Sequence, residues 1–369
     1  MILTILNPSF SSLGFVDDAK SIIWHSAYYT SGDFEIYARA TERYLDLLKV
    51  GYYAVRDDDG SVGIIESVDV KFTREQGYMI TATGRDAKSI LDRRLIYNLS
   101  DHTNTPTILS GLVETAVRSL VANNAISNSD IKRNISILSL GELKGYTETI
   151  VDENGNAAEK QVSYQNLLTY TDSLLKDYGL GARLLRSGNG FAYEVFKGAD
   201  RSTDNTDENQ PIIFSTEYDN LTSSDYKYDE SVHKNVALIG GAGQDLDRFY
   251  ELLAGDETGL ARREVFVNAS SINRTYKDGD TEQTYTDAEY SQLLKQNGRT
   301  ALASQTALET FDGDVNVTFG NWLLNRDYFL GDIVTVQDNM LGKYINTRIS
   351  DTTEVWDDNG YLVNVKFSD

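Results

Sequence analysis

The chain has 369 residues, 40% of them hydrophobic and 11% aromatic, so it can bury a substantial interior over about two to four domains. Its 34 basic and 56 acidic residues give a formal net charge of −22, which argues against a surface that grips nucleic acid or adheres to anionic lipid. The absence of cysteine excludes disulfides and thiolate metal sites, and no apolar run approaches the ~20 residues of a membrane-spanning helix.

The first hundred residues are predicted to form strands. Residues 62–72 place apolar side chains at almost every second position, which is typical of a half-buried strand. Residues 34–38 and 78–83 alternate in the same way. We therefore expect an antiparallel sheet or small barrel, and assign a first β-barrel domain to residues 1–95.

Two helices are predicted in the middle of the chain. The first begins at a Thr105 cap and continues as an apolar stripe to Leu120. The second runs from a Ser163 cap to a stop at Gly179. Two short strands joined by a glycine-containing turn follow it, so residues 96–205 are expected to form a smaller α/β module.

Strands return from residue 206 onward. The capping box Thr286-x-x-Glu289 opens a helix, which predicts a helical insertion near 286–308. Four strand-like stretches follow it, V-N-V-T-F, D-I-V-T-V, Y-I-N-T-R-I-S and Y-L-V-N-V-K-F. We assign a second β-barrel region to residues 206–369.

Two segments, 48–70 and 328–350, share one order of features: an apolar residue, a glycine, a strand, a polar turn with a glycine, and a strand. The glycines are Gly51 and Gly60 in the first segment and Gly331 and Gly342 in the second. This echo predicts two copies of one barrel in a single chain. The expected fold class is a β-rich α+β protein with two similar β-barrel domains and the α/β module between them.

The stretch N-V-A-L-I-G-G-A-G-Q (235–244) has the outline of a strand that enters a phosphate-binding turn. No lysine follows its last glycine, so it is not a P-loop, and Leu246 occupies the third glycine position of the dinucleotide fingerprint. Asp245 and Asp247 would also repel a phosphate. We therefore expect a buried strand whose glycines permit a bulge or a close backbone approach.

No other motif points to a catalytic or metal-binding site. His25, His102 and His233 lack the spacing of metal ligands. The turns 57–60 and 357–360 have the acidic look of calcium loops, but a hairpin turn is independently expected at each, so turn chemistry is favoured. Abundant carboxylates give no specific catalytic pair, and G-x-S-x-G is absent. We predict no catalytic, cofactor-binding or metal-binding residues and no enzymatic activity.

The 23 tyrosines are unusually many for this length. Pairs such as Tyr28-Tyr29 and Tyr52-Tyr53 would suit stacking on sugars. Aromatic residues of strands more commonly contribute to a partly solvated subunit interface, because a ring with a hydroxyl group fits such an interface.

Four groups of short stretches follow one another along the chain. They are G-D-F-E-I-Y-A-R-A (32–40) with G-I-I-E-S-V-D-V (63–70) and T-A-T-G-R-D-A-K-S-I-L-D-R-R (81–94), N-V-A-L-I-G-G-A-G-Q (235–244) with G-L-A-R-R-E-V-F-V-N-A-S (259–270), G-R-T-A-L-A (298–303), and Y-F-L-G-D-I-V-T-V (328–336). Their order and spacing resemble the tail hub proteins of long-tailed phages and prophages, which are akin to the hub at the centre of contractile-phage baseplates. The resemblance covers nearly the whole chain.

This resemblance implies a structural protein of the phage tail tip, or baseplate hub. Such hubs assemble as a homotrimeric ring in which two similar barrels per chain give a near-sixfold face, and that face seats on a sixfold distal tail ring protein. The ring surrounds a channel for the tape-measure protein and then for DNA, which passes during ejection without being bound. A net charge of −22 fits an acidic channel that repels phosphates over about one Debye length of ~8–10 Å.

Further expectations follow from the resemblance. The protein is expected in the virion, assembled in the host cytoplasm, with no membrane insertion and no cofactor. Because the chain ends at Asp369, just after the strands of the second barrel, we expect no cell-wall-cleaving domain. Two alternatives stay open: a carbohydrate- or receptor-binding tail module that uses surface tyrosines, and a cell-wall-degrading tail enzyme.

Overall fold

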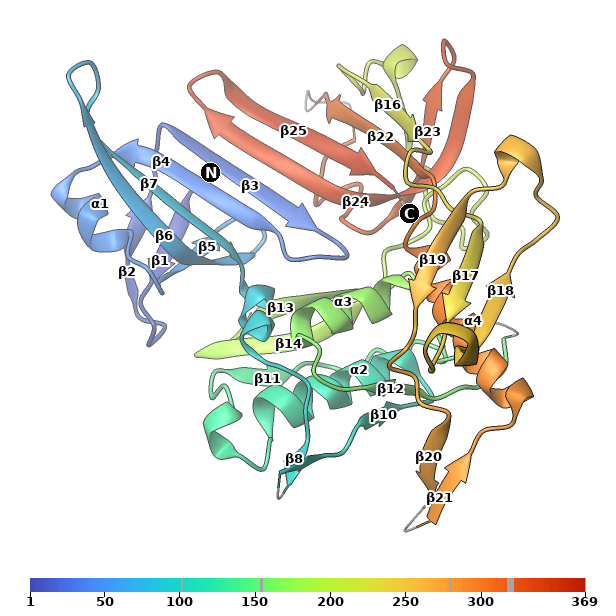
Figure 1. Ribbon diagram of the computed structural model, residues 1–369. Helices are drawn as coiled ribbons and strands as arrows, with labels where there is room; N and C mark the ends of the chain where they lie inside the picture. The colour runs from blue at the N-terminus through green and yellow to red at the C-terminus, as the bar shows by residue number, and fades with distance from the viewer. Residues whose placement is uncertain (101, 153–154, 279–280, 317–321, 369) are drawn as a thin grey trace. The chain divides into compact units, whose positions relative to one another are not determined.

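The computed structural model describes residues 1–100, 102–152, 155–278, 281–316 and 322–368 (Figure 1). The chain divides into two compact units. The first unit combines Met1–Asp225 with Phe311–Asp369, and the second unit is Tyr226–Thr310. Within the described residues, no helix is both long and apolar enough to cross a lipid bilayer.

One large sheet holds most strands of the first unit. From the first hundred residues it takes β1 (Leu3–Leu6), β2 (Ser12–Val16), β3 (Ser21–Ala27), β4 (Asp33–Arg39), β5 (Tyr53–Arg56), β6 (Val62–Thr73) and β7 (Gly77–Asp86). From the end of the chain it takes β22 (Leu308–Val315), β23 (Ile333–Asp338), β24 (Lys343–Asp357) and β25 (Gly360–Phe367). The path runs β16-β22-β25-β24-β3-β4-β7-β6-β5-β1-β2, where β16 is Asp225–Asp229. Away from this path, β23 pairs with β24 and with β15 (Ile213–Ser215). The two ends of the chain therefore meet where β24 pairs with β3.

The alternation that predicted strands is visible in the burial of the sheet. In β3 and β4, the side chains of Ile22, Trp24, Phe34 and Ile36 are buried, and the residues between them are half-buried. These rings and branched chains form one core together with residues of β1, β6 and β7 and with α1 (Glu42–Leu47). Period-two patterning thus places one face of the sheet inward, as expected for an antiparallel sheet with one dry face.

A smaller α/β module joins this sheet within the first unit. Helices α2 (Val113–Val121) and α3 (Leu167–Lys176) pack with a three-stranded sheet of β11 (Leu138–Leu140), β14 (Gly190–Phe196) and β13 (Gly181–Ser187). A short pair, β10 (Thr107–Leu109) and β12 (Lys160–Val162), completes it. Apolar side chains of β5 and β6 belong to the same core as the module, so the two parts share an interior.

The predicted starts of both helices are wrong. The first helix begins at Val113 rather than after Thr105, because residues 107–109 pair as β10 and Gly111 adopts a left-handed φ of 73°. The second is capped by Asn166 rather than Ser163. A left-handed φ of 60° at Tyr164, between the two candidate caps, prevents an earlier start.

The second unit is a three-stranded sheet covered by one helix (Figure 1). Strand β17 (Val236–Gly240) lies between β18 (Tyr250–Leu253) and β19 (Glu264–Asn268). Helix α4 (Asp287–Ala303) packs on β17 through Tyr290 and Leu294. The capping box Thr286–Glu289 is confirmed. The Thr286 hydroxyl accepts a hydrogen bond from the backbone N–H of Glu289, and the Glu289 carboxylate accepts one from the backbone N–H of Thr286. A hairpin of β20 (Thr275–Asp278) and β21 (Thr281–Thr284) precedes the helix.

The β-rich α+β class is confirmed. Among the described strands, however, no sheet closes on itself into a barrel. The two-barrel arrangement and the domain limits at 95/96 and 205/206 therefore stay predictions. The predicted strand V-N-V-T-F begins at Val315, the last residue of β22, and its residues from 317 on lie outside the described part of the chain.

Candidate functional site

The glycines of the stretch 235–244 serve close packing. A Cβ on Gly240 would lie 2.7 Å from the Arg248 guanidinium, and one on Gly241 would lie 2.7 Å from the hydroxyl of Tyr290 in α4. The expected buried strand with a close backbone approach is therefore confirmed in β17.

The acidic side chains of the turns 57–60 and 357–360 accept hydrogen bonds from the backbone of the same turns. Asp59 accepts a hydrogen bond from the Ser61 N–H at 2.8 Å, and Asp357 accepts one from the Asn359 N–H at 2.8 Å. Glu66 stands at calcium-loop spacing after Gly60, but Arg85 holds both of its oxygens, at 2.8 and 2.9 Å. In the described part of the chain, no group of three or more His, Asp or Glu is placed to hold a metal ion.

The tyrosines named for surface roles are partly internal. Tyr28 is fully buried, and its hydroxyl lies 3.1 Å from the carbonyl oxygens of both Gly179 and Phe196, which share its one proton. Tyr53 is 6% exposed and stacks on Phe10 with ring centroids 4.9 Å apart. These two rings cannot stack on a sugar or a partner, because the chain's own core already covers them.

A cavity of about 400 Å³ lies in the first unit where the large sheet meets the α/β module. Its walls come from β3, the β5–β6 turn, the end of β7, β13, β14, the segment before β23, and β24. Trp24, Phe196 and Phe329 supply aromatic surface. Four carboxylates also line it: Asp58, Asp59, Asp86 and Glu354. A pocket of this size with a few polar groups is the natural place to look for chemistry.

Arg56 is the central charge beside this cavity. It is 1% exposed, and its guanidinium binds Glu354 at 2.5 and 3.1 Å and Asp58 at 2.7 and 2.9 Å. The rings of Trp24 and Trp356 lie 5.6 and 5.2 Å from its Cζ atom. Burial alone would lower the pKa of Arg56, but the hydrogen bonds to the two carboxylates raise it above its usual value.

The pair Arg56–Glu354 joins strands that are distant in the sheet. Arg56 ends β5 and Glu354 lies in β24, and four strands separate β5 from β24 along the sheet path. The sheet must curl for their side chains to meet, so the ion pair ties its two parts across the interior. Tyr361 of β25 also donates to Glu354, at 2.6 Å. We call Arg56, Glu354, Asp58 and Tyr361 the ionic joint.

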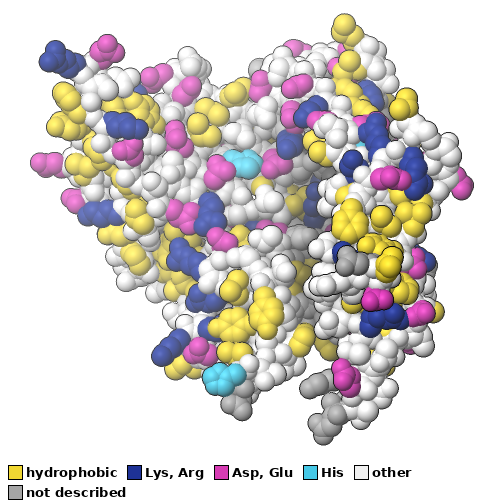
Figure 2. Space-filling view, viewed as in Figure 1, with side chains coloured by type: hydrophobic (Ala, Val, Ile, Leu, Met, Phe, Trp, Pro, Cys, Tyr) yellow, Lys and Arg dark blue, Asp and Glu magenta, His cyan; other side chains and the backbone are white. Residues whose placement is uncertain are grey.

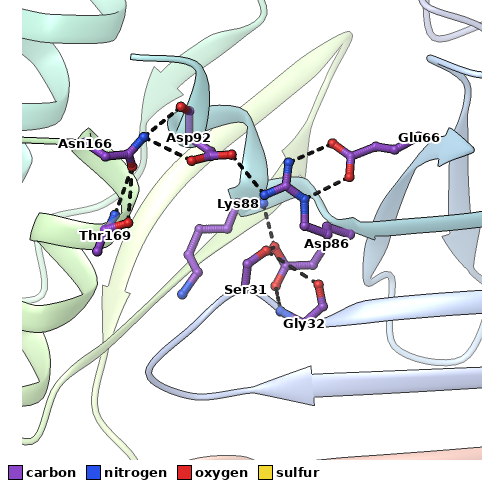
Figure 3. A network of polar contacts seen from close by, with 9 residues as sticks. Ser31, Gly32, Glu66, Asp86, Lys88, Asp92, Asn166 and Thr169 are labelled. Atoms are coloured by element: carbon purple, nitrogen blue, oxygen red, sulfur yellow. Dashed lines mark hydrogen bonds and ion pairs between the residues drawn. The ribbon is translucent and has the colours of Figure 1, made fainter. Parts of the chain in front are cut away.

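A second network fastens the end of β7 (Figure 3). Asp86 accepts from the Ser31 hydroxyl, the Gly32 N–H and the Lys88 N–H, each at 2.9 Å. The Lys88 side chain points away from this network and binds Asp172 of α3 at 3.0 Å. Burial raises the pKa of Asp172 to about 6, although Lys88 opposes the shift.

The network continues into the α/β module. Arg85, which holds Glu66, also binds Asp92 at 3.0 Å. Asp92 in turn accepts from the Asn166 side chain at 3.0 Å, and Asn166 caps α3 by accepting from the Thr169 N–H at 3.1 Å (Figure 3). One run of charged and amide groups thus connects β6, β7 and the start of α3.

His25 forms a further bridge at the meeting of β24 and β3. Its Nδ1 lies 3.1 Å from Asp33 of β4, and its Nε2 lies 3.1 Å from Asp351 of β24. Hydrogen bonding to Asp351 and Asp33 raises the pKa of His25, against the effect of burial. Asp351 shows the reciprocal shift: burial would raise its pKa, but the bond to His25 contributes to lowering it.

The arrangement holds strands and turns together. Each of the four carboxylates that line the cavity is already engaged by an arginine, a hydroxyl or a backbone N–H. The charged side chains of the face drawn in Figure 2 are mixed in sign, with no single-sign field.

Sequence reasoning missed the ionic joint. Arg56 and Glu354 are separated by 298 positions, so no local spacing connects them. The available signal was an arginine at the end of the apolar run Y-Y-A-V, in a strand whose four residues are all buried. A charge in such a place requires a partner.

Comparisons with known proteins bear on the whole chain. A family model described as Siphovirus ReqiPepy6 Gp37-like protein matches residues 2–367. A 43 kDa tail protein of prophage MuSo2 from Shewanella oneidensis has a similar fold, with a TM-score of 0.58 and 11% identity, covering 100% of this chain and 98% of that chain. A tail protein from Neisseria meningitidis MC58 is also similar, with a TM-score of 0.56 and 15% identity, over 100% and 96%. A search of curated proteins finds no match.

Proposed function

The chain belongs to the family of Siphovirus ReqiPepy6 Gp37-like proteins, and from that membership we propose that it is a structural component of a phage tail, working as a hub. Three copies form a ring around an acidic channel, and the ring seats on the distal tail ring protein. The observation that carries this proposal is the full-length match in fold to tail proteins, over 100% of this chain in both structures.

The proposed ring rests on two similar barrel-like modules per chain, within domains at residues 1–95 and 206–369 that flank the module at 96–205. The echoed segments give this idea independent support. Both form antiparallel hairpins, β5–β6 and β23–β24. Their glycines take left-handed φ angles at matching places: 85° at Gly51 and 93° at Gly331 before the first strand, then 75° at Gly60 and 65° at Gly342 in the turn. Two equivalent modules in each of three chains would present a near-sixfold face.

The proposed mechanism uses shape and charge without an enzymatic step. A net charge of −22 makes passing DNA phosphates slide rather than bind, because like charges repel across a Debye length of ~8 Å. The tape-measure protein occupies the channel before the DNA does. The protein is then located in the tail of the virion, which is assembled in the host cytoplasm. Tyr28 and Tyr53 are buried and cannot serve the carbohydrate-binding alternative, which would have to use exposed rings such as Tyr78 and Tyr164.

The proposal is tested by assembly. The chain should be co-expressed with the distal tail ring protein of the same phage and the products imaged by negative-stain electron microscopy. We expect closed rings with half as many copies of this chain as of the ring protein. Immunogold labelling of purified phage should place the chain at the tail tip. Absence of the chain from purified particles would overturn the structural role.

A further inference from the structure

Three arginines, Arg93, Arg94 and Arg133, converge in the first unit beside a second pocket. The pocket has a volume of about 400 Å³. It lies between Tyr53 and Ile64 of the large sheet, the 3-10 helix η1 (Ala87–Arg93) with Arg94 after it, and Ser136 of the segment before β11. Two arginines line it, and no carboxylate is among its lining residues.

Two of the arginines have a structural role. Arg94 donates to the carbonyl of Arg133 at 2.6 Å and to that of Arg93 at 2.9 Å. Arg133 donates to the carbonyls of Leu95 and Tyr97 at 2.5 and 3.2 Å, and its Cζ lies 3.8 Å from the centre of the Tyr97 ring. These bonds fix the connection between the sheet and the α/β module, and they neutralise neither charge.

Arg93 has no such structural role. Its side chain is exposed, and within the described residues the structure gives its guanidinium no hydrogen bond or ion pair. It lines the pocket together with Arg94. The basic group is unusual in a chain with 22 more acidic than basic residues, where most arginines could find a carboxylate.

The charges of the three arginines repel one another. Burial lowers the pKa of Arg94, and the neighbouring charges of Arg133 and Arg93 lower it further. An anion in the pocket would relieve this repulsion and accept from two guanidinium forks. Both forks keep donors that no carbonyl uses, because a guanidinium has five N–H groups.

We propose that this pocket binds a carboxylate from an acidic protein segment, with Arg93 and Arg94 as the recognising side chains. A planar guanidinium matches a planar carboxylate bidentately. A nucleic acid is the poorer fit, because it needs a track of basic groups along several phosphates, whereas this cluster is compact and the chain is strongly acidic. The inference stands apart from the proposed hub role, since it rests on the pocket alone.

The acidic segment has two possible sources with the same chemistry: a second copy of this chain, which carries 56 acidic residues, or a different protein. The experiment uses the full-length chain and a fluorescein-labelled polyglutamate peptide with blocked ends, in a low-salt buffer. Fluorescence anisotropy gives the dissociation constant. A polyglutamine peptide of equal length controls for charge, and a short oligothymidylate tests for phosphate.

We expect R93Q to weaken the binding of polyglutamate by about tenfold. S136E, which places a carboxylate in the pocket, should weaken it similarly. The matched control is R74Q, which removes the same charge from an exposed arginine in the β6–β7 turn and should bind as the unmodified chain does. Because Arg93 and Ser136 are exposed, both variants should retain the fold, which circular dichroism checks.

Sedimentation velocity of the same proteins without peptide identifies the source. If R93Q weakens self-association, the segment comes from a second copy; if R93Q loses only peptide binding, the segment belongs to another protein. The proposal is overturned if R93Q and S136E bind polyglutamate like R74Q. It is also overturned if oligothymidylate binds as tightly and depends on Arg93 in the same way.

Discussion

His25 has a carboxylate at each ring nitrogen. A neutral imidazole carries one N–H, so it can donate to only one of Asp33 and Asp351, and the other nitrogen would then face an oxygen lone pair. Only the imidazolium satisfies both 3.1 Å contacts. The charge continues across the sheet, since Lys366 of β25 lies opposite Asp351 and Asp312 of β22 lies opposite Lys366. Protonation of one residue therefore matters where the two ends of the chain pair.

This geometry predicts a pH-dependent stability. The folded-state pKa of His25 is raised above the unfolded value of 6.5, so its contribution is fully present below pH 6.5 and is lost as pH rises through the folded pKa. We expect urea unfolding of the unmodified chain to lose on the order of 1 kcal/mol over that range, relative to H25Q. H102N is the control, because His102 has a left-handed φ of 64° that asparagine tolerates. Parallel pH profiles for the unmodified chain and H25Q would contradict the bridge.

At the scale of elements, the large sheet is held in its curled form by side chains as well as by backbone pairing. Strands β5 and β24 exchange no backbone hydrogen bonds, yet Arg56 and Glu354 connect them in the interior. A buried pair of this kind contributes little net free energy compared with apolar residues, but a lone survivor is costly. The joint therefore acts mainly by making wrong arrangements of these strands unfavourable.

Removal of one partner tests this interpretation. E354A should lower the free energy of unfolding by about 3–5 kcal/mol, because the guanidinium of Arg56 stays buried with only the carboxylates of its own turn, Asp58 and Asp59, beside it. The double variant R56M/E354L should recover most of the loss. E75A, at an exposed position in the β6–β7 turn, should change the value by less than about 0.5 kcal/mol. A double variant as unstable as E354A would show that lost packing, rather than a stranded charge, is responsible.

At the scale of the whole molecule, the second unit is an insertion with its own interior. The chain enters it at Tyr226, within β16 (Asp225–Asp229), and leaves it at Thr310, within β22. Its core contains Ala237, Ile239, Ala269, Tyr290 and Leu294, with no member from the first unit. A separate core of this kind lets a segment be removed without exposing the rest.

Replacement of residues 230–307 by a short Gly-Ser linker, which leaves β16 and β22 complete, should therefore leave the first unit folded. We expect the shortened chain to keep a cooperative thermal transition, monitored by circular dichroism, close to one of the transitions of the complete chain. The ionic joint gives an internal check: E354A should destabilise the shortened chain as much as the complete one. A shortened protein without a cooperative transition would mean that the first unit depends on the second.

The sequence by itself determined the features that depend on near neighbours. Alternation over residues 62–72 was sufficient for β6, because side chains in a strand point to opposite faces in turn. The capping box at Thr286 and Glu289 was correct for α4, since both partners lie within one helical turn. The dipeptides Asp59-Gly60 and Asn359-Gly360 predicted the two hairpin turns for the same reason.

The tertiary structure alone decided which distant residues meet. Helix α2 starts at Val113 because the residues before it form β10, which pairs with β12 about fifty residues further along the chain. Arg56 and Glu354, 298 positions apart, became partners only when β24 paired with β3 and the sheet curled. Arg93 became part of a basic pocket only when the segment before β11 folded against η1. The periodicity of the sequence indicates which side chains of a strand or helix are buried, because that depends on near neighbours. Which distant residues they contact is decided only when the strands pair in the folded chain.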